Sequence, residues 1–307
     1  MKVVFMGTPQ FAVPTLTALM RSKHEVCLVV TGPDKRAGRS LKVTTTPVKR
    51  MAEELELPIL QPIDFKNPDF LAQLSEASPD LCVVVAFKIL PLAVLEIPKF
   101  GCVNLHPSML PDLRGAAPIN WALMNGYTST GMTTFLIEKR VDAGGILIQE
   151  PVEIQPEDDA GSLSERLSKN GADLIVRTID LLEKCSITPC KQNGSVTKAP
   201  KITIEMCELD WSKTAQQLHN QIRGLSPTPS AFTHIKKKRL KIYKSVVVDS
   251  DYQGEPGEII GFENDVLIVA TGSGKLGIMD LQVEGKRRMT SSEFQRGAHN
   301  IIGTKFV

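Results

Sequence analysis

The chain has 307 residues, of which 42% are hydrophobic and 23% are charged, and its formal net charge at pH 7 is +2. Its 22 Gly and 20 Pro residues are ordinary usage, which excludes collagen-like, low-complexity and disordered chains. No apolar run approaches the roughly 20 residues that cross a bilayer. The start turns at Gly7 before a signal-peptide pattern develops. We therefore expect a cytoplasmic protein without a membrane segment.

The first 185 residues alternate strand and helix signals. We expect strands over six apolar runs: Lys2–Phe5, Val26–Val30, Pro58–Leu60, Leu81–Ala86, Cys102–His106 and Thr133–Ile137. Helices are expected after Phe11, from the cap-and-proline pairs Thr46-Pro47 and Asn67-Pro68, and over Ser162–Lys184. Continuous apolar strands separated by helices are typical of a parallel sheet that is covered on both faces. The sequence thus predicts an α/β domain at 1–185 with a doubly wound, mostly parallel, Rossmann-like sheet.

Residues 186–208 are a polar connector, and a different pattern follows at 209–307. One helix is expected over Asp210–Arg223. Five short strand-like pieces come next, separated by Gly, Asn or Asp: Ala231–Ile235, Leu240–Val248, Gly257–Gly261, Val266–Ala270 and Leu276–Val283. A helix followed by five short strands predicts a small OB-like β-barrel, a fold that often binds nucleic acids.

Two basic runs stand out on this nearly neutral chain. Thr31–Arg50 holds Lys and Arg at six positions against one Asp, and Ile235–Lys244 holds them at six positions with no acid. A single run of this kind is usually solvated surface. Two runs favour a polyanionic partner such as a nucleic acid.

Several kinds of site are disfavoured by their missing motifs. The first turn, Gly7-Thr8-Pro9-Gln10, is not GxGxxG, and no acidic residue ends the second strand, so an NAD or FAD site lacks its phosphate cradle and its ribose acceptor. There is no CxxC or HExxH spacing, so we expect reduced thiols and no metal. Ser108 has no GxSxG elbow around it, which disfavours a covalent serine mechanism.

A polar pair ends the fifth expected strand. Asn104 and His106 are two residues apart, so both side chains point to the same face. Pro107 and Pro111 then keep the chain extended, and Gly115 is expected to open a helix. The structural alternative is a strand-end Asn with a His that is satisfied by the backbone.

A carboxylate follows the sixth expected strand, in the turn Val141-Asp142-Ala143-Gly144-Gly145. We expect this turn to project Asp142 toward the neighbouring strand end, where it pairs with His106. Together the three groups suit acyl transfer. The amide donates to a developing oxyanion, the imidazole handles the proton, and the carboxylate orients the imidazole.

These residues carry a family resemblance. Asn-x-His-x-Ser-x-Leu-Pro at 104–111, Arg-Gly-Ala-Ala-Pro-Ile at 114–119 and Asp-x-Gly at 142–144 resemble the formyltetrahydrofolate-dependent formyltransferases. Four further segments narrow the resemblance to the branch that acts on methionyl-tRNA, over essentially the whole chain: Val4–Pro14, Pro33–Arg39, Thr46–Lys49 and Ala199–Ile202.

The resemblance implies a reaction and a set of site residues. The expected reaction is direct transfer of the formyl group of 10-formyltetrahydrofolate to the α-amino group of methionyl initiator tRNA, by a metal-free monomer that serves translation initiation. The implied catalytic residues are Asn104, His106 and Asp142, and the residues that line the folate pocket are Ser108, Met109, Leu110 and Pro111. The implied tRNA contacts come from a basic loop and from the barrel, and they are Lys35, Arg36, Arg39, Lys42, Lys237 and Lys238.

The chain departs from the family pattern in three places. Ala86–Pro91 lacks one residue and the Gly of the usual Ala-Tyr-Gly-x-Ile-Leu-Pro, so the loop beside the folate pocket is expected to be reshaped. Ser226–Pro229 replaces Asn-Pro-Trp-Pro, and Lys198 replaces a common Tyr. Two alternatives stay open: a formyltransferase that acts on a nucleotide or sugar amine, and an RNA-binding protein whose catalytic domain is silent.

Overall fold

The computed structural model describes residues 1–37, 42–249, 252, 254–298 and 300–307, without the side chains of residues 36, 37 and 42. Its contacts divide the chain into two compact units. The first consists of Met1–Gly115, Thr130–Glu153 and Ser164–Lys198, and the second of Ala116–Ser129, Ile154–Leu163 and Ala199–Val307. In the described part of the chain, no helix is long and apolar enough to cross a membrane.

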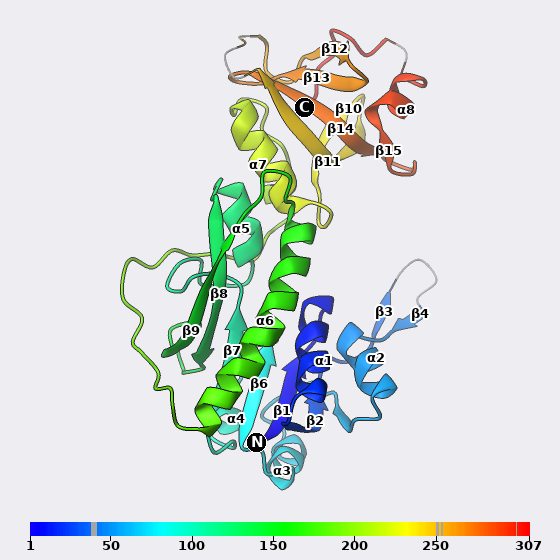
Figure 1. Cartoon of the computed structure of the whole chain (residues 1–307). Helices are drawn as coiled ribbons and strands as arrows, with labels where there is room; N and C mark the ends of the chain where they lie inside the picture. The colour runs from blue at the N-terminus through cyan, green and yellow to red at the C-terminus, as the bar shows by residue number, and fades with distance from the viewer. Residues whose placement is uncertain (38–41, 250–251, 253, 299) are drawn as a thin grey trace. The chain divides into compact units, whose positions relative to one another are not determined.

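A seven-stranded sheet organises the first unit, in the order β5-β2-β1-β6-β7-β8-β9 (Figure 1). The strands are β1 (Lys2–Gly7), β2 (Glu25–Val30), β5 (Ile59–Leu60), β6 (Leu81–Val85), β7 (Cys102–His106), β8 (Ser129–Leu136) and β9 (Ile146–Glu153). The pairs from β5 to β7 are parallel, and β8 runs antiparallel to β7. The predicted mostly parallel, doubly wound sheet is confirmed, with β9 as a strand that the sequence did not reveal.

The helices that accompany this sheet are α1 (Val13–Arg21), α2 (Pro47–Glu54), α3 (Pro68–Glu76), α4 (Leu92–Leu95) and the long α6 (Ala160–Glu183). Two of them, α2 and α3, begin directly after a residue whose side chain caps the helix. The Thr46 hydroxyl accepts from the Lys49 N–H at the start of α2, and the Asn67 side chain accepts from the Asp69 N–H at the start of α3. Both predicted helix starts are therefore confirmed.

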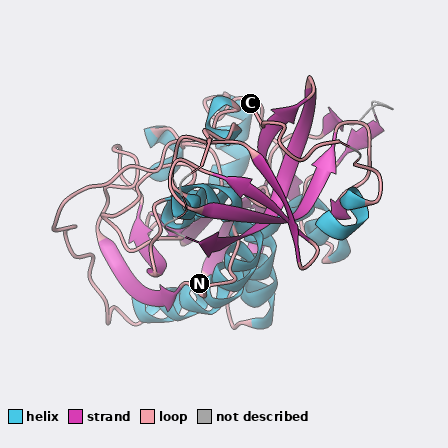
Figure 2. Cartoon of the chain, turned by 90° about the horizontal axis from the view of Figure 1, so that it is seen from above, coloured by secondary structure: helices cyan, strands magenta, loops and turns pink. Residues whose placement is uncertain are grey.

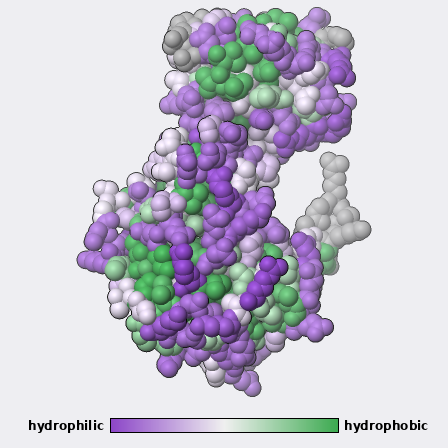
Figure 3. Space-filling model, in the orientation of Figure 1, coloured by the Kyte–Doolittle hydropathy of each residue, from purple (hydrophilic) through white to green (hydrophobic). Residues whose placement is uncertain are grey.

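The burial of side chains in β1 and α6 follows the patterns expected for a covered strand and an amphipathic helix. Residues 3–6 of β1 are all fully buried, as expected for a strand with both faces covered. Along α6, Leu167 and Leu174 are buried, whereas Glu165 and Lys169 are exposed one turn apart and form an ion pair. In Figure 3 the outward face of this helix is hydrophilic.

The predicted basic loop contains a short hairpin for which the sequence analysis expected no strands. Strands β3 (Lys35–Ala37) and β4 (Lys42–Thr44) pair antiparallel, with Lys35 opposite Thr44. Arg39 lies outside the described residues, as do the side chains of Arg36 and Lys42.

The second unit combines helices with an antiparallel sheet in the order β10-β11-β14-β13-β12, and β15 pairs with β14. Its elements are α5 (Pro118–Met124), α7 (Ala215–Leu225), β10 (Ala231–Ile235), β11 (Lys238–Asp249), β12 (Ile259–Glu263), β13 (Val266–Ala270), β14 (Lys275–Val283), β15 (Met289–Thr290) and α8 (Ser291–Gln295). The five predicted strands are confirmed, and Figure 2 shows them in magenta.

The last residues of the chain link the two edges of this antiparallel sheet. The Phe306 N–H donates to the Gly257 carbonyl just before β12, and His234 of β10 exchanges two backbone hydrogen bonds with Val307. Pairing of both edges is what a closed barrel requires. These bonds are compatible with the expected barrel, and the OB-like topology itself stays a prediction.

Two predicted helix starts were wrong. The helix expected from Asp210 begins at Ala215, because the Asp210 carboxylate accepts from the N–H and hydroxyl of Ser212 and so holds a turn there. Thr214 caps the helix with Gln217 in a capping box. The helix expected from Gly115 begins at Pro118, the residue type favoured at the first helical position.

Candidate active site

The carboxyl ends of the parallel strands meet at one edge of the sheet. The strand order reverses between β1 and β6, and ligands of doubly wound folds bind outside this point. A hollow of about 540 Å³ opens there, within the size range of small-molecule sites. It is lined by Thr8, Pro9, Gly32, Pro33, Lys35, Thr44, Thr45, Thr46, Ala86, Phe87 and Lys88.

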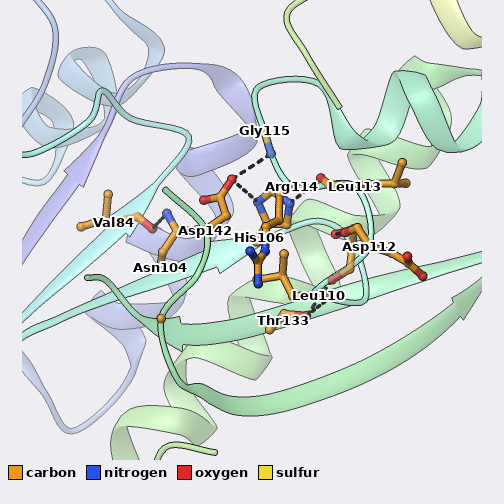
Figure 4. A network of polar contacts seen from close by, with 12 residues as sticks. Val84, Asn104, His106, Leu110, Asp112, Leu113, Arg114, Gly115, Thr133 and Asp142 are labelled. Carbon is orange, nitrogen blue, oxygen red and sulfur yellow. Dashed lines mark hydrogen bonds and ion pairs between the residues drawn. The ribbon is translucent and has the colours of Figure 1, made fainter. Parts of the chain in front are cut away.

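Asn104 lies in β7, next to β6 at this edge. Its Nδ2 donates to the main-chain carbonyl of Val84 at 3.0 Å (Figure 4). An amide nitrogen has two N–H groups, so the bond to Val84 fixes the orientation of the amide and leaves the other N–H for a substrate oxygen. Asn104 as a whole is only partly buried.

His106, on the same face of β7, is held by the backbone. Its Nε2 lies 3.0 Å from the main-chain oxygen of Leu113, and a carbonyl oxygen only accepts, so Nε2 carries the proton. Nδ1 therefore presents a lone pair in the neutral ring. The side chain is buried, and this burial lowers the pKa of His106, although the Asp142 carboxylate acts in the opposite direction.

Asp142 reaches the pair from the turn between β8 and β9. Its Oδ2 lies 4.0 Å from His106 Nδ1 and accepts a hydrogen bond from the Gly115 N–H at 2.8 Å. The structure thus brings together the amide, the imidazole and the carboxylate that the sequence singled out. The orientation of the ring, however, comes from Leu113 rather than from Asp142, because 4.0 Å exceeds hydrogen-bond length.

The turn that carries Asp142 is tight. Asp142 has φ +50°, in the left-handed region, and a Cβ built on Gly144 would lie 1.7 Å from the Leu136 carbonyl oxygen. Glycine is therefore required at 144 for the backbone to pass β8 so closely. The glycine at 144 has this physical reason.

Of the four residues predicted to line the folate pocket, two are buried and two are partly exposed. The Ser108 hydroxyl donates to the Asp112 carbonyl at 2.5 Å, and Leu110 is 3% exposed. Thr133 of β8 donates to the Ser108 carbonyl and accepts from the Leu110 N–H. Ser108 and Leu110 thus build the loop, whereas Met109 and Pro111 stay partly exposed.

Lys35 lines the hollow at the base of the basic loop. The neighbouring Asp34 carboxylate accepts from Lys49 Nζ at 2.6 Å and from Gln61 Nε2 at 2.9 Å, and Gln61 also donates to the Gly32 carbonyl. Lys49 is the main cause of the lowered pKa of Asp34. The wall of the hollow is thereby braced by Lys49, which belongs to the predicted basic run, and by Gln61, which the sequence analysis did not single out.

A second hollow, of about 530 Å³, lies on the antiparallel sheet of the second unit. Lys237 lines it together with His234, Arg239, Lys241 and one carboxylate, Glu284, and Lys238 is exposed beside it. The guanidinium of Arg239 lies 4.3 Å from the centre of the Phe232 ring, which holds the charge in place. The basic run therefore forms a cationic hollow.

No group of three or more His, Cys, Asp and Glu side chains suited to a metal ion occurs in the described ranges. The residues that the sequence reading missed at the active site are Leu113, Thr133 and Gln192. Leu113 and Thr133 act through a carbonyl or a hydroxyl, which no spacing pattern reveals. Gln192 comes from the connector, about fifty residues after the turn that it contacts.

Comparison with protein families matches both parts of the chain. A family described as "Formyl transferase" matches residues 1–179, and one described as "Formyl transferase, C-terminal domain" matches residues 201–299. The chain is 43% identical over 307 residues to a methionyl-tRNA formyltransferase of Geobacter sulfurreducens, covering 99% of the chain and 96% of that relative. It is 44% identical to the enzyme of the same description from Alkaliphilus oremlandii, covering 99% and 100%.

Solved structures share the fold. The sugar 3N-formyl transferase WlaRD aligns with a TM-score of 0.67 at 19% identity, covering 94% of this chain and 99% of that chain. A methionyl-tRNA formyltransferase from Clostridium thermocellum aligns with a TM-score of 0.57 at 17% identity, covering 81% and 94%. At these identities the likeness concerns the fold alone.

Proposed function

The chain belongs to the methionyl-tRNA formyltransferases of the formyl transferase family, and from this premise we propose that it transfers the formyl group of 10-formyltetrahydrofolate to the α-amino group of methionyl initiator tRNA. The observation that carries the proposal is the meeting of Asn104, His106 and Asp142 at the edge of the sheet. One donor, one base and one carboxylate are the groups that acyl transfer to an amine needs.

Each of the three residues has a role that follows from its contacts. When bound, 10-formyltetrahydrofolate supplies the formyl group. Asn104 donates its second N–H to the oxygen that becomes negative as the amine adds to the formyl carbon. His106 accepts the amine proton at Nδ1, the nitrogen that faces Asp142. The Asp142 carboxylate then stabilises the imidazolium charge. When the tetrahedral adduct collapses, the bond between the formyl carbon and N10 of the folate breaks and N10 takes the proton from His106, so tetrahydrofolate leaves and the imidazole is neutral again.

The partly exposed residues of the 108–111 loop suit the folate. Met109 and Pro111 offer apolar surface to a flat ring system, and the Ser108 hydroxyl and the Leu110 side chain are already used inside the loop. We therefore assign the folate contacts of this stretch to Met109 and Pro111. The roles of Ser108 and Leu110 are to fix the backbone.

The hollow between β1 and β6 suits the methionyl end of the tRNA. Pro9, Pro33 and Phe87 give it apolar walls for the methionine side chain, whose burial stabilises binding by about 1.5–3 kcal/mol. Lys35 lies on the same wall and leads into the basic hairpin. A phosphate backbone that follows the acceptor end meets that charge.

The cationic hollow on the second unit is the other tRNA contact in this proposal. Of the sequence prediction, Lys237 lines this hollow and Lys238 is exposed beside it, and we add Arg239 and Lys241. We further propose that the enzyme acts as a cytoplasmic monomer. Arg36, Arg39 and Lys42 remain predicted tRNA contacts of the basic loop.

The direct test is formyl transfer by the purified protein. The protein is incubated with 10-formyltetrahydrofolate and methionine-charged initiator tRNA, and the released aminoacyl group is analysed for a blocked α-amine. Uncharged tRNA is the control. A nucleotide-linked amino sugar is assayed in parallel, because the rival formyltransferases act on such amines. Formylation of the sugar alone would overturn the proposal.

A further inference from the structure

The connector between the predicted domains passes the candidate active site at Gln192. The side chain of this residue makes four hydrogen bonds within the first unit. Its Nε2 donates to the main-chain carbonyls of Asp142 at 2.9 Å and of Gly144 at 2.8 Å. Its Oε1 accepts from Nε of Arg114 at 3.1 Å and from Nη2 of Arg114 at 2.5 Å.

This contact set matches the chemistry of a primary amide. A glutamine side chain offers two N–H donors on one atom and two lone pairs on the other, and here all four are used. A carboxylate of the same length has no N–H to offer, and an apolar side chain of the same length makes none of the four bonds. The side chain at 192 is therefore specified by its partners.

The two carbonyls that Gln192 binds belong to the turn that aims the Asp142 carboxylate. Asp142 has φ +50°, in the left-handed region that is uncommon for residues other than glycine, and the two bonds from Gln192 brace the turn in this conformation. On the other side of the turn, the Asp142 carboxylate accepts from the Gly115 N–H, and Gly115 directly follows Arg114. Gln192, which lies in the connector, thus links the Asp142 turn to the Arg114–Gly115 loop.

We propose that Gln192 is a positioning residue that acts through Asp142, by holding the turn so that the carboxylate stays beside His106. This inference rests on the proposed formyl transfer, and it extends the active site to the connector. Gln192 touches no reacting group itself.

The test is a double-mutant cycle with Asp142. Gln192→Met keeps the length of the side chain and removes all four hydrogen bonds. We expect kcat to fall by up to about 10²-fold, the loss that a small misplacement of a catalytic group produces, with KM for both substrates within about threefold. In the Asp142→Asn background the same change should cost less than about twofold, because two residues that act as one unit are not additive. Equal losses in both backgrounds would overturn the inference.

Gln192→Glu distinguishes the bonds that the side chain accepts from Arg114 from those that it donates to the Asp142 turn. The carboxylate still accepts from Arg114 but donates to neither carbonyl of the turn, so we expect a loss like that of Gln192→Met. A kcat near that of the wild type would also overturn the inference. Gln73→Met is the matched control, because Gln73 is exposed on α3 and its Nε2 donates only within its own helix, to the Asp69 carbonyl.

Amide hydrogen exchange gives a readout that needs no turnover. The Gly115 N–H donates to the Asp142 carboxylate, so it should exchange faster in Gln192→Met and at the wild-type rate in Gln73→Met. Unchanged protection of Gly115 contradicts the inference. If the wild-type protein formylates no methionyl-tRNA, the proposed function fails, and exchange at Gly115 then decides the positioning role by itself.

Discussion

The main-chain carbonyl of Leu113 lies 3.0 Å from Nε2 of His106, and this contact sets the tautomer of the ring. With the proton on Nε2, the lone pair on Nδ1 faces the Asp142 carboxylate at 4.0 Å. Burial lowers the pKa of His106, so the ring is neutral and ready to accept a proton at pH 7. A base that must take a proton from an amine needs this state.

The acid limb of kcat/KM should lie below pH 6.5, the ordinary pKa of a histidine, because burial lowers the pKa of His106. Activity is lost as pH falls through the lowered value, where Nδ1 becomes protonated. Asp142→Asn removes the carboxylate that raises this pKa, so the limb should move to still lower pH. A pH–rate profile of both proteins checks this, and a limb that moves upward in the variant would contradict the assignment.

Asn104→Ala should lower kcat about 10²–10³-fold, the usual cost of removing one oxyanion donor. KM for the folate and the tRNA should change little, because the hydrogen bond from the Asn104 amide to the formyl oxygen strengthens only as negative charge develops on that oxygen. Steady-state kinetics with both substrates measures this. Asn125→Ala, on an exposed residue after α5, is the control and should keep wild-type rates.

Charge reversal at Lys35 or Lys237 should weaken tRNA use and leave folate binding unchanged. Each lost phosphate contact should reduce the slope of log K against log salt by about 1. The measurement is KM for tRNA at several salt concentrations. Lys99→Glu is the control, because Lys99 is exposed just before β7, at the opposite edge of the sheet. Equal loss of folate binding in the Lys35 variant would mean that this residue is structural.

Gly144→Ala should lower both stability and kcat. The new Cβ would lie 1.7 Å from the Leu136 carbonyl oxygen, so the turn that carries Asp142 must shift, at a cost of about 1–3 kcal/mol. Urea unfolding and steady-state kinetics measure the two effects. At Gly297 the nearest atom would be 3.9 Å away, so Gly297→Ala should be close to neutral. A fully active Gly144→Ala protein would remove the turn from the mechanism.

Stability should fall on acidification because the fold shields three histidines from water. Burial lowers the pKa of His24, of His106 and of the partly buried His219. Below pH 6.5 the unfolded chain therefore binds more protons, so the stabilisation is present above about pH 6.5 and is lost as pH falls through the folded values. His219→Gln should flatten the dependence of the unfolding free energy on pH between 5 and 7. Urea unfolding at several pH values measures this, and a slope in His219→Gln equal to that of the wild type would contradict it.

Local signals predicted most of the elements that carry the site. The Thr46 and Asn67 caps stand directly before a proline, so two adjacent residues were enough to predict each helix start. The start of α7 was misplaced because Asp210 and Thr214 are both cap residues, and only the turn made with Ser212 distinguishes them. Strand β9 was missed because its burial is incomplete and its apolar pattern is weak.

The amino-acid sequence by itself determined the order of most strands and helices, the shared face of Asn104 and His106, and the two basic runs, because apolar periodicity, caps and charge act over a few residues. The tertiary structure decided which groups reach the imidazole. Leu113 holds the ring, Asp142 stands 4.0 Å from it, and Gln192 binds the turn of Asp142 from 50 positions away. Such contacts depend on how distant segments pack across the sheet edge, and no local spacing encodes a distance in space.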